Sequence, residues 1–586
     1  MRQWMVAAKK ADFYAIAEKF HVDPVVARII RNREVIGEKN IRIYLGGNLS
    51  DLSDPHQMKD MDRLVEILAQ KIRKQVHIRI IGDYDVDGVT SSHLFLTALR
   101  RVGAKVDVVI PHRIQDGYGL SLHLLQQAKE DGVDTILTCD NGIAAIDEIA
   151  WAKAQKMTVL VTDHHAVPFE EHEGRRTEKK SLADAVVNPH QQDCRYPYKE
   201  LCGAGVAWNV IRVLYENYDM DKREAEDLLD FVAMATVCDV MSLTGENRIL
   251  VKEGLKRIRH TKNIGLQALM QACNVQPENI SAYHFGYVLG PCVNATGRLD
   301  TARHALRLFE TGQETEAEEI ARDLVDLNQE RKELTLQGVE MAKKLCEEGG
   351  YENDPILVLF LPDVHESIAG LIAGRIREMY NRPVFVLTRG EEGVKGSGRS
   401  TENYSMYENM CGCVELFTKF GGHPMAAGLF LPEENVEKFR RKINENCPLT
   451  VEEVCPDIHI DMAMPVGYAS TELVHQFALL EPFGKDNPSP LFADRNLSIS
   501  RMWLIGKNRN VLRMSVLSEY GQPVPVIFFG DVETLFAYFT EKFGQEEVEN
   551  ALHGRKNRIL FSMVYTAKID FYQGNENLQL EMKYYR

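Results

Sequence analysis

The sequence predicts an α/β protein with three folded parts: a domain built on a parallel sheet, a second α/β domain joined to it by a long helical spacer, and a C-terminal β-barrel of the OB type. Short β-branched, apolar runs alternate with helical stretches from Val76 to Asn188, which is the pattern of a doubly wound parallel sheet. After about Asp457 strand-like segments dominate, and five of them fit a small barrel.

The elements of the first domain follow one another along the chain. Its expected strands are Val76–Ile81, Lys105–Ile110, Asp134–Thr138, Met157–Thr162 and Ala185–Asn188. Helices are expected at Gly88–Val102, at Ser121–Glu130 and within Arg223–Lys262. Residues 1 to about 60 should form a helical lead-in. The strongly charged stretch Glu170–Lys180 is expected to be a long flexible loop.

The spacer and the two later domains are also visible in the sequence. Arg303–Glu348 is charged and largely helical, with a break near Thr311-Gly312. The second α/β domain should contain strand Pro355–Leu361, helix Ser367–Tyr380 and strand Pro383–Leu387. The barrel, with one clear helix, should contain strands Leu497–Ile505, Val511–Leu517, Pro523–Phe529, Arg558–Ala567 and Leu578–Tyr584. The expected parts are therefore residues 1–60, 61–300, 301–348, 349–456 and 457–586.

The composition is that of a soluble globular protein. The chain has 586 residues, of which 45% are hydrophobic and 26% charged, and no apolar run is long enough to span a membrane. It begins without a signal-peptide pattern, and its 11 cysteines are scattered, so we expect reduced thiols in the cytoplasm. The net charge of -16 argues mildly against nucleic-acid binding but does not exclude it, because binding depends on a local basic groove.

Acidic residues and histidines follow three of the predicted strands, at the point where each strand ends. In chain order they are Asp83, Asp85 and Asp87, then Asp140, and then Asp163, His164 and His165. Because ligands of open parallel sheets bind beyond the carboxyl ends of the strands, these side chains should converge at one edge. Carboxylates with imidazoles suit Mn²⁺ or Mg²⁺ better than a structural zinc ion. The sequence therefore predicts a metal site.

Simpler explanations of these clusters exist. An Asp-x-Asp-x-Asp-Gly segment also opens an EF-hand loop, but the twelfth position counted from Asp83 is Leu94 instead of glutamate. The three carboxylates could be solvated turn residues, and a His-His pair is often only a packed or surface pair. Asp239, in Thr236-Val237-Cys238-Asp239, could be an ordinary helix cap.

Other motif-based functions do not fit. A zinc protease motif starting at His365-Glu366 would need a second histidine where Ala369 stands. The first domain has no Gly-x-x-x-x-Gly-Lys motif, and Gly203-Ala204-Gly205 continues to Trp208 where a dinucleotide fingerprint requires glycine. A nucleotide-hydrolysing motor and a nicotinamide enzyme are therefore disfavoured.

Basic residues mark candidate anion sites. Gly396-Ser397-Gly398-Arg399-Ser400 could be a simple turn, but glycines, serine and arginine together suit a phosphate. Arg113 and Arg298 lie in expected turns, where a surface ion pair is the simpler explanation. The barrel combines basic with aromatic residues, as single-strand binding requires, although some of the aromatic side chains could be core. These residues are Arg501, Lys507, Arg509, Arg513 and Lys568, with Trp503, Tyr520 and Tyr565.

Taken together, the motifs resemble the RecJ single-stranded-DNA-specific exonucleases of the DHH phosphoesterase superfamily. Gly82-Asp83-Tyr84-Asp85-Val86-Asp87-Gly88 and Asp163-His164-His165 look like the first and third motifs of that superfamily. Further RecJ-like segments cover nearly the whole chain. They are Asp116-Gly117-Tyr118-Gly119-Leu120, Asp140-Asn141-Gly142, Leu201-Cys202-Gly203-Ala204-Gly205-Val206, Thr236-Val237-Cys238-Asp239, Gly297-Arg298-Leu299, His365-Glu366, Gly396-Ser397-Gly398-Arg399-Ser400, Gly421-Gly422-His423 and Leu480-Glu481-Pro482-Phe483-Gly484.

The resemblance implies a DHH domain, a DHH-associated domain, an OB-fold, and stepwise 5′→3′ release of mononucleotides from single-stranded DNA with two Mn²⁺ or Mg²⁺ ions. It places Asp83 and Asp85 on one ion, Asp87, His164 and Asp239 on the other, and Asp140 between them. Asp163 would orient its neighbours, and His165 would contact the scissile phosphate or the attacking water. The 5′ end would be received by Arg113, Arg298, Ser397 and Arg399, with His423 close to the substrate.

Four positions depart from the family pattern without removing a ligand: Asp116, Cys292, Val364 and Asp486. Two other functions stay open at this point. One is a phosphodiesterase of the same superfamily for short oligoribonucleotides, cyclic dinucleotides or pyrophosphate, which would generally lack the barrel. The other is a non-catalytic replication scaffold, which would have lost its ligands. A helicase and a single-strand-binding protein are partners implied by the family alone.

Overall fold

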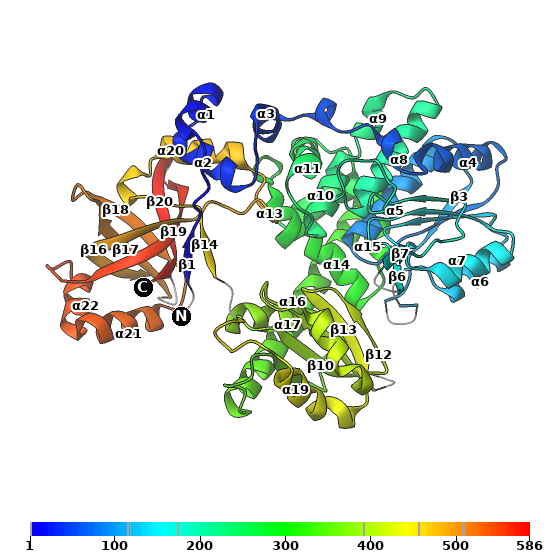
Figure 1. Ribbon diagram of the computed structural model, residues 1–586. Coiled ribbons are helices and arrows are strands. Elements are labelled where there is room, and N and C mark those ends of the chain that lie inside the picture. Colours follow the sequence, from blue (N-terminus) through cyan, green and yellow to red (C-terminus); the bar gives the residue numbers. More distant parts are fainter. Residues whose placement is uncertain are drawn as a thin grey trace. The chain divides into compact units, whose positions relative to one another are not determined.

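The computed structural model describes residues 3–113, 116–117, 119–172, 175–390, 393–454, 457–506, 510–572 and 574–586. The chain forms two compact units (Figure 1). The first unit contains Leu49–Pro456, and the second combines Gln3–Asn48 with Asp457–Arg586. Each unit has its own hydrophobic core.

A five-stranded parallel sheet lies at the centre of the first part of unit 1, as predicted. Its strands, in the order β3-β2-β4-β5-β8, are Val106–Val109, Ile78–Ile81, Thr135–Cys139, Thr158–Thr162 and Ala185–Val187. Ile81 is in register with Thr138, and Cys139 with Thr162. The carboxyl ends of the three central strands are therefore level, which brings the residues that follow them to one edge.

Helices cover both faces of this sheet (Figure 1). Ile78 and Ile80 point into a core formed with α5 (Val86–Arg101), α4 (Met61–Arg73) and α8 (Gly203–Asn217). Ile81, Ile136 and Val159 point to the other face. There they pack against α6 (Leu122–Glu130) and α7 (Ile146–Ala154). Apolar side chains on both faces explain why these strands are continuous β-branched runs.

One loop prediction was wrong. The stretch expected to be a long flexible loop contains two antiparallel strands, β6 (Phe169–His172) and β7 (Arg175–Glu178), in which Phe169 pairs with Glu178. The stretch is strongly charged throughout, and charge alone does not distinguish a two-stranded ribbon from a loop.

The rest of the first part of unit 1 is helical. Its helices are α9 (Lys222–Glu226), α10 (Leu229–Cys238), α11 (Gly245–Ile258), α12 (Ile264–Ala272), α13 (Ala282–His284), α14 (Gly290–Leu299) and α15 (Arg303–Glu310), with 3₁₀ turns at Leu49–Asp51, Pro55–Gln57 and Pro277–Asn279 and a π-helical turn at Phe285–Leu289. The predicted spacer is α16 (Glu314–Glu348), and the expected break separates it from α15. Ala317, Ile320 and Leu324 bury one face of α16 in the first core.

A second five-stranded sheet follows in unit 1. Its strands, in the order β12-β13-β11-β10-β9, are Lys419–Gly422, Ala426–Leu431, Gly393–Arg399, Val384–Gly390 and Leu357–Phe360. Only β9 and β10 are parallel among these neighbours. The helices around it are α17 (Ala369–Tyr380), α18 (Met406–Met410) and α19 (Val436–Glu445), with 3₁₀ turns at Glu366–Ile368, Cys411–Leu416 and Glu433–Asn435.

The glycine-rich segment that could have been a turn is strand β11. A Cβ atom on Gly396 would lie 2.5 Å from Leu387 Cδ2, and one on Gly398 would lie 2.6 Å from Met406 Sδ. The glycines are therefore required by packing on one face of the sheet. Because side chains alternate along a strand, Ser397 and Arg399 point to the opposite face.

Unit 2 is a mainly antiparallel sheet with helices added from both ends of the sequence. The sheet order is β15-β16-β17-β18-β20-β19, and β19 also pairs with β16. These strands are Met462–Ala463, Phe492–Ile505, Val511–Leu517, Pro523–Phe528, Asn575–Tyr585 and Leu560–Tyr572. Two helices, α21 (Val532–Phe543) and α22 (Gln545–Leu552), lie between β18 and β19, where only one was expected. The glycine between them, Gly544, ends the first helix.

The N-terminal residues are helical, as predicted, but they belong to unit 2. Strand β1 (Trp4–Val6) pairs in parallel with β14 (Ile458–Ile460). Arg33 holds Asp461 through two hydrogen bonds of 2.7 and 3.0 Å. The helices are α1 (Phe13–Phe20), α2 (Pro24–Asn32), α3 (Glu38–Gly46) and α20 (Thr471–Phe477), with 3₁₀ turns at Val466–Tyr468 and Ala478–Leu480. None of the helices within the described ranges has the length and apolar character to cross a bilayer.

Candidate metal centre

The first three carboxylates lie where strand β2 passes into helix α5. Asp85 is the N-cap of α5, and its Oδ1 accepts hydrogen bonds from the backbone N–H groups of Asp87 at 2.9 Å and Gly88 at 3.1 Å. Asp83 and Asp87 are buried on either side of it. The backbone N–H of Val86 is bound by the side-chain oxygen of Asn294 at 3.1 Å, so α14 also supports this loop.

The other two strand ends supply Asp140 and the Asp163-His164-His165 segment. Asp140 has a φ of 61°, which turns the chain sharply after β4. Asp163 follows β5, and its Oδ2 accepts a hydrogen bond from Ile143 N at 2.9 Å. Its Oδ1 lies 2.7 Å from both His164 N and His165 Nδ1. Both oxygens of Asp163 are therefore hydrogen-bonded to groups of the protein, and one of them holds the imidazole of His165 in place.

These residues form three groups whose candidate ligand atoms lie within 4.8 Å of one another. The groups are Asp83, Asp85 and Asp140; Asp87, His164 and Asp239; and Asp140, His164 and His165. Nε2 of His164 is 3.1 Å from Asp140 Oδ1 and 3.6 Å from Asp239 Oδ2. Asp239 is the C-cap of α10. It lies in one group with Asp87 and His164, which come far before it in the sequence. The predicted ligands are thus brought together at one edge of the sheet.

The electrostatics of the cluster favour a bound cation. Burial and the neighbouring Asp85 carboxylate hold the pKa of Asp83 well above its usual range, and burial with Asp87 does the same for Asp140. Burial and Asp85 raise the pKa of Asp87 to about 6. A divalent cation would offset the repulsion between these carboxylates and let them stay ionised.

The donor atoms also fit such a cation. Within the described residues, the buried atoms Asp83 Oδ1 and His164 Nε2 have no hydrogen-bond partner. Burial and His165 lower the pKa of His164 to about 3, so its ring is neutral and can offer a lone pair. Carboxylate oxygens with neutral imidazole are suitable ligands for Mn²⁺ or Mg²⁺. The arrangement matches the metal site expected from the sequence.

His165 differs electrostatically from His164. Burial opposes its protonation, but the hydrogen bond to Asp163 and the nearby carboxylates outweigh burial and raise the pKa of His165 to about 9. The ring is about two-fifths exposed at the side chain, whereas His164 is almost fully buried. His165 is therefore the more accessible histidine of the pair.

Three arginines gather beside the metal cluster. Arg113 stacks over the ring of Tyr84, 4.7 Å from its centroid, and Arg298 donates to Ser367 O at 2.8 Å. Burial, followed by Arg113 and other arginines, lowers the pKa of Arg298 to about 9. Burial and the charge of Arg113 also lower the pKa of Arg399. Cations crowded in this way form a site for an anion.

Ser397 belongs to the same group, and His423 stands apart from it. Arg399 Nη1 lies 3.5 Å from Ser397 Oγ and donates to Gly398 O at 2.7 Å. His423 is exposed in the turn between β12 and β13, which its backbone N–H closes by donating to Ala426 O at 2.8 Å. No described contact joins His423 to the arginines.

Several contributors to the site were not singled out individually from the sequence. Gly203 N and Ala204 N donate to the two oxygens of Asp87 at 2.6 and 2.7 Å. Asn294 and Ser367 hold the loop before α5 and the guanidinium of Arg298, respectively. The family-like segments around residues 203 and 297 point to this region of the chain. They could not identify the backbone N–H donors, because any residue type can supply a backbone N–H group.

The predicted basic and aromatic surface of the barrel is only partly present. Tyr565 is core: it is buried, and its hydroxyl donates to Met464 O at 2.8 Å. Lys568 is paired with Glu581 at 2.6 Å. Arg501 lies over the ring of Trp503, and Tyr520 is 80% exposed. Lys507, Arg509 and, in the first domain, Tyr118 lie outside the described residues.

Two of the positions that depart from the family pattern have clear structural partners. Cys292 is buried, and its Sγ lies 3.8 Å from Cys273 Sγ and accepts from Asn328 Nδ2 at 3.3 Å. Asp116 Oδ2 accepts a hydrogen bond from His112 N at 2.8 Å. Neither residue contributes to the three ligand groups.

Three family models match the chain. They describe the DHH family, N-terminal domain, at residues 77–236, the DHHA1 domain at residues 353–447, and the RecJ OB domain at residues 460–584. The matched ranges follow the order of the folded parts described above.

Curated relatives extend over nearly the whole chain. The single-stranded-DNA-specific exonuclease RecJ of Haemophilus influenzae is 32% identical over 582 residues, which is 96% of this chain and 96% of that protein. The protein of the same name from Escherichia coli is 31% identical over 95% of both chains. The Bacillus subtilis protein is 33% identical over 87% of this chain, which spans 63% of that longer relative.

Solved structures agree with these relatives. RecJ from Thermus thermophilus in complex with Mn²⁺ has a TM-score of 0.81 and 25% identity, covering 100% of this chain and 79% of that one. An exonuclease RecJ bound to manganese is 32% identical, with a TM-score of 0.57 over 66% of this chain and 94% of that one. The Thermus thermophilus RecJ complex with Mg²⁺ shares the fold, with a TM-score of 0.75.

Proposed function

Because the chain belongs to the RecJ family of single-stranded-DNA-specific exonucleases, we propose that it is a metal-dependent phosphodiesterase that removes mononucleotides from the 5′ end of single-stranded DNA. The observation that carries this proposal is the convergence of the carboxylate and histidine cluster with three crowded arginines in one unit. A cluster that holds cations beside a pocket that holds an anion is what cleavage of a terminal phosphodiester requires.

The carboxylate cluster would hold two Mn²⁺ or Mg²⁺ ions. Asp83 and Asp85 would serve one ion, Asp87, His164 and Asp239 the other, and Asp140 would serve both. When bound, such a pair makes water a nucleophile at neutral pH and offsets charge that develops on the phosphate. Asp140 is suited to the shared position because it groups with Asp83 and Asp85 and also lies 3.1 Å from His164, which belongs to the other set.

Asp163 and His165 would act on the substrate side of this cluster. Asp163 holds Nδ1 of His165 at 2.7 Å and thereby sets the orientation of the ring. A charged imidazole donates hydrogen bonds from both nitrogens, so the remaining one is available to the scissile phosphate or the attacking water. We assign Asp163 a positioning role and His165 a direct contact.

The arginine group would receive the 5′ end of the strand. Arg113, Arg298 and Arg399 present guanidinium groups that can bind a terminal phosphate in a bidentate manner. Ser397 adds a hydroxyl next to Arg399. A pocket that ends the path of the strand would explain release from the 5′ terminus, and we propose that His423 lies close to the substrate.

A groove continues from this pocket within unit 1 and suits the following nucleotides. It has a volume of about 1190 Å³ and reaches from Arg399 to Val240, the residue after Asp239. Its other basic lining residues are Arg331, Lys332, Arg375 and Arg377. Leu336, Met379 and Met425 are exposed along it. Cations for the backbone with apolar surface for bases favour single strands of any sequence.

The cellular setting follows from the family and belongs to the proposal. We propose that the enzyme acts in the cytoplasm in DNA repair and recombination, where a helicase and a single-strand-binding protein would present its substrate. We also propose domain limits at residues 61–300, 301–348, 349–456 and 457–586. The range 457–586 would be an OB-fold that binds single-stranded DNA.

The two other functions are disfavoured. A phosphodiesterase for short or cyclic nucleotides would generally lack the C-terminal barrel, whereas residues 460–584 match the RecJ OB domain. A non-catalytic scaffold would have lost its ligands, whereas the residues of all three ligand groups are present and close together.

Substitution of the shared ligand tests the proposal. Asp140→Ala should abolish cleavage of single-stranded DNA in the presence of manganese, while binding of the strand, followed by fluorescence anisotropy, survives. Asp147→Asn, which changes an exposed carboxylate in the first turn of α7, is the matched control and should keep full activity. Equal loss of binding and cleavage in Asp140→Ala would contradict the metal role of Asp140.

A further inference from the structure

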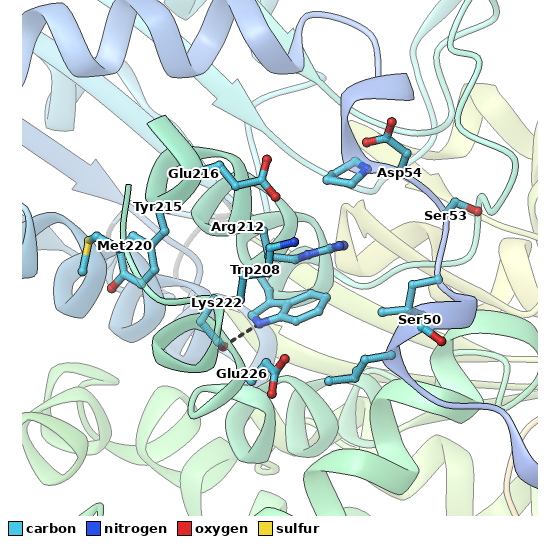
Figure 2. A pocket seen from close by; sticks show the side chains of 14 residues that line it. Ser50, Ser53, Asp54, Trp208, Arg212, Tyr215, Glu216, Met220, Lys222 and Glu226 are labelled. Carbon is cyan, nitrogen blue, oxygen red and sulfur yellow. Dashed lines mark hydrogen bonds between the residues drawn. The ribbon is translucent and has the colours of Figure 1, made fainter. Parts of the chain in front are cut away.

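The cavity in Figure 2 belongs to unit 1 and shares no lining residue with the metal cluster. It has a volume of about 460 Å³ and lies between residues 49–55 and helices α8 and α9. Its central ring, Trp208, donates from Nε1 to Ala225 O at 2.7 Å, and the guanidinium of Arg212 lies 4.9 Å from the centroid of that ring. The N–H group of Trp208 is therefore satisfied within the protein, and the cavity gives no reason to expect a ligand.

A pair of cysteines elsewhere in unit 1 is placed for redox chemistry. Cys273 caps the C-terminal end of α12, and Cys292 lies in the first turn of α14. Their sulfur atoms are 3.8 Å apart. Because an S–S bond is about 2.05 Å long, the two sulfurs need to approach by less than about 2 Å to form one. Neither cysteine belongs to the three ligand groups of the metal centre.

The two thiols differ in exposure and in charge. Cys292 is 2% exposed, whereas Cys273 is partly exposed. The contact with Cys273, followed by burial, raises the pKa of Cys292. A hydrogen bond from Cys292 and the charge of the exposed Lys332 outweigh burial and lower the pKa of Cys273. The more accessible sulfur is thus the one that favours the thiolate, which is the form of cysteine that reacts with oxidants.

The buried sulfur of the pair is linked to the basic groove through two hydrogen bonds. Cys292 Sγ accepts from Asn328 Nδ2 at 3.3 Å, and Asn328 Oδ1 accepts from Arg331 Nε at 3.1 Å. Both Arg331 and Lys332 line the groove. The charge of Arg331 also reaches the end pocket, because it contributes to the lowered pKa of Arg298. A change at Cys292 can therefore alter the cations of the groove.

We propose that Cys273 and Cys292 form a reversible disulfide when the protein meets a peroxide, and that this bond weakens the binding of single-stranded DNA in the groove. In the first step the Cys273 thiolate attacks one oxygen of hydrogen peroxide, the O–O bond breaks, and a sulfenic acid and hydroxide are formed. In the second step the sulfur of Cys292 attacks the sulfenic sulfur. The S–S bond forms, the S–O bond breaks, and the thiol proton of Cys292 leaves with the OH group as water. The two sulfurs together lose two electrons, which reduce the peroxide, and a thiol reductant reverses the reaction by exchange.

The new bond changes the contacts of Cys292. The thiol that donates to Val288 O at 3.3 Å loses its proton, and the sulfur shifts from the position that Asn328 binds. Asn328 then holds Arg331 less firmly. Because contacts between cationic side chains and the DNA backbone contribute to affinity, binding of the strand should weaken. This effect on DNA rests on the proposed function, whereas formation of the bond does not.

Peptide mapping by mass spectrometry tests the bond on the full chain without DNA. The reduced protein is treated with hydrogen peroxide in native buffer with EDTA, its remaining thiols are blocked with N-ethylmaleimide, and it is then digested. We expect a peptide pair in which Cys273 is linked to Cys292, and its disappearance after treatment with dithiothreitol. Cys273→Ser should abolish the linkage. Cys411→Ser, which removes an exposed cysteine of the second sheet domain, is the matched control and should leave the linkage unchanged.

Fluorescence anisotropy with a single-stranded oligonucleotide, again in EDTA, measures the effect on the groove. Peroxide should weaken the affinity of the wild-type chain by about fivefold, because one charge-assisted contact to the backbone is impaired, and dithiothreitol should restore it. Cys292→Ser removes the second sulfur and should bind DNA equally well before and after peroxide.

Two outcomes would overturn the proposal. The first is a Cys273 that stays reduced, or that is oxidised to a sulfinic acid without linkage to Cys292. Because this result is obtained on the wild-type chain, it is decisive even if a serine variant fails to fold. The second is a linked protein with unchanged affinity for DNA, which would remove the effect on the groove. A reduced chain that does not bind single-stranded DNA would count against the proposed function instead, and the peptide map would still decide whether the bond forms.

Discussion

The carboxylate of Asp87 accepts a hydrogen bond from the backbone N–H of Gly203, with 2.6 Å between Oδ2 and N. The other oxygen accepts from Ala204 N at 2.7 Å. Gly203 begins helix α8, whose N-terminal end favours a negative charge. This contact joins the first turn of α5 to a helix 116 residues further along the chain, and it orients the carboxylate of a predicted metal ligand.

Asp87→Asn should reduce cleavage by about a hundredfold or more, because the amide removes a charge from the metal site and turns an NH₂ group toward a backbone donor. Single-turnover cleavage of single-stranded DNA over a manganese titration measures the effect. Part of the loss should be recovered at high manganese if the affinity for the ion is what falls. Activity close to that of the wild type at low manganese would remove Asp87 from the ligand set.

Gly203→Ala should also inactivate the enzyme. A Cβ atom at this position would lie 2.7 Å from Asp140 Cβ, closer than real contacts allow, so Asp140 or α8 must move. Gly205→Ala is the matched control, because its Cβ would meet its nearest neighbour, Leu201, at an ordinary 3.4 Å. Cleavage rates and thermal unfolding of both variants separate a displaced site from a damaged fold. Equal activity of the two variants would count against close packing at Asp140.

Arg399→Ala should weaken the preference for a 5′-phosphorylated strand over a 5′-hydroxyl strand by about tenfold, since one charge-assisted contact to the phosphate is lost. The measurement is the ratio of kcat/KM for the two substrates. Arg375→Ala is the control, because Arg375 is exposed and lies on the groove instead of in the end pocket. Arg375→Ala should lower kcat/KM for both substrates by the same factor. An unchanged ratio in Arg399→Ala would exclude Arg399 from the pocket.

Asp107 should make folding stability dependent on pH. Burial alone would raise the pKa of Asp107, but hydrogen bonds from Arg79 at 2.9 and 2.7 Å and the charge of His77 lower it overall. A carboxyl with a depressed pKa stabilises the fold above its unfolded pKa, and this contribution is lost as the pH falls through the folded pKa. Asp107→Asn should therefore lower the melting temperature at about pH 7 and progressively less toward about pH 3. A difference that does not change with pH would contradict this assignment.

The ends of the central strands can be predicted from the sequence, because the signals for them lie within a few neighbouring residues. Each of the runs before Asp83, Asp140 and Asp163 is apolar, β-branched and bounded by turn residues, so both the strand and the edge could be inferred. For Gly396 the sequence left a simple turn and an anion site open, whereas in the structure this glycine leaves room for Leu387 and Leu429. Composition cannot distinguish these two causes, since both require a missing Cβ atom.

Long-range pairing was beyond the reach of sequence patterns. Trp4 pairs with Ile458, and Arg33 binds Asp461, so the N-terminal helices join the barrel instead of the sheet domain that follows them. Tyr565 has the sequence signature of a binding residue but lies in the core with a satisfied hydroxyl. Aromatic residues occur both in protein cores and at binding surfaces, and only their burial in the structure distinguishes the two.

The most direct test of the central claim is a time course with manganese on single-stranded DNA labelled at one end or the other. Matched duplex and EDTA reactions serve as controls. The account predicts that a 5′ label is released at once as a mononucleotide, only from the single strand and only with metal, while a 3′ label stays on a shortening strand. Release of the 3′ label first, or hydrolysis of dinucleotides without cleavage of longer strands, would contradict it.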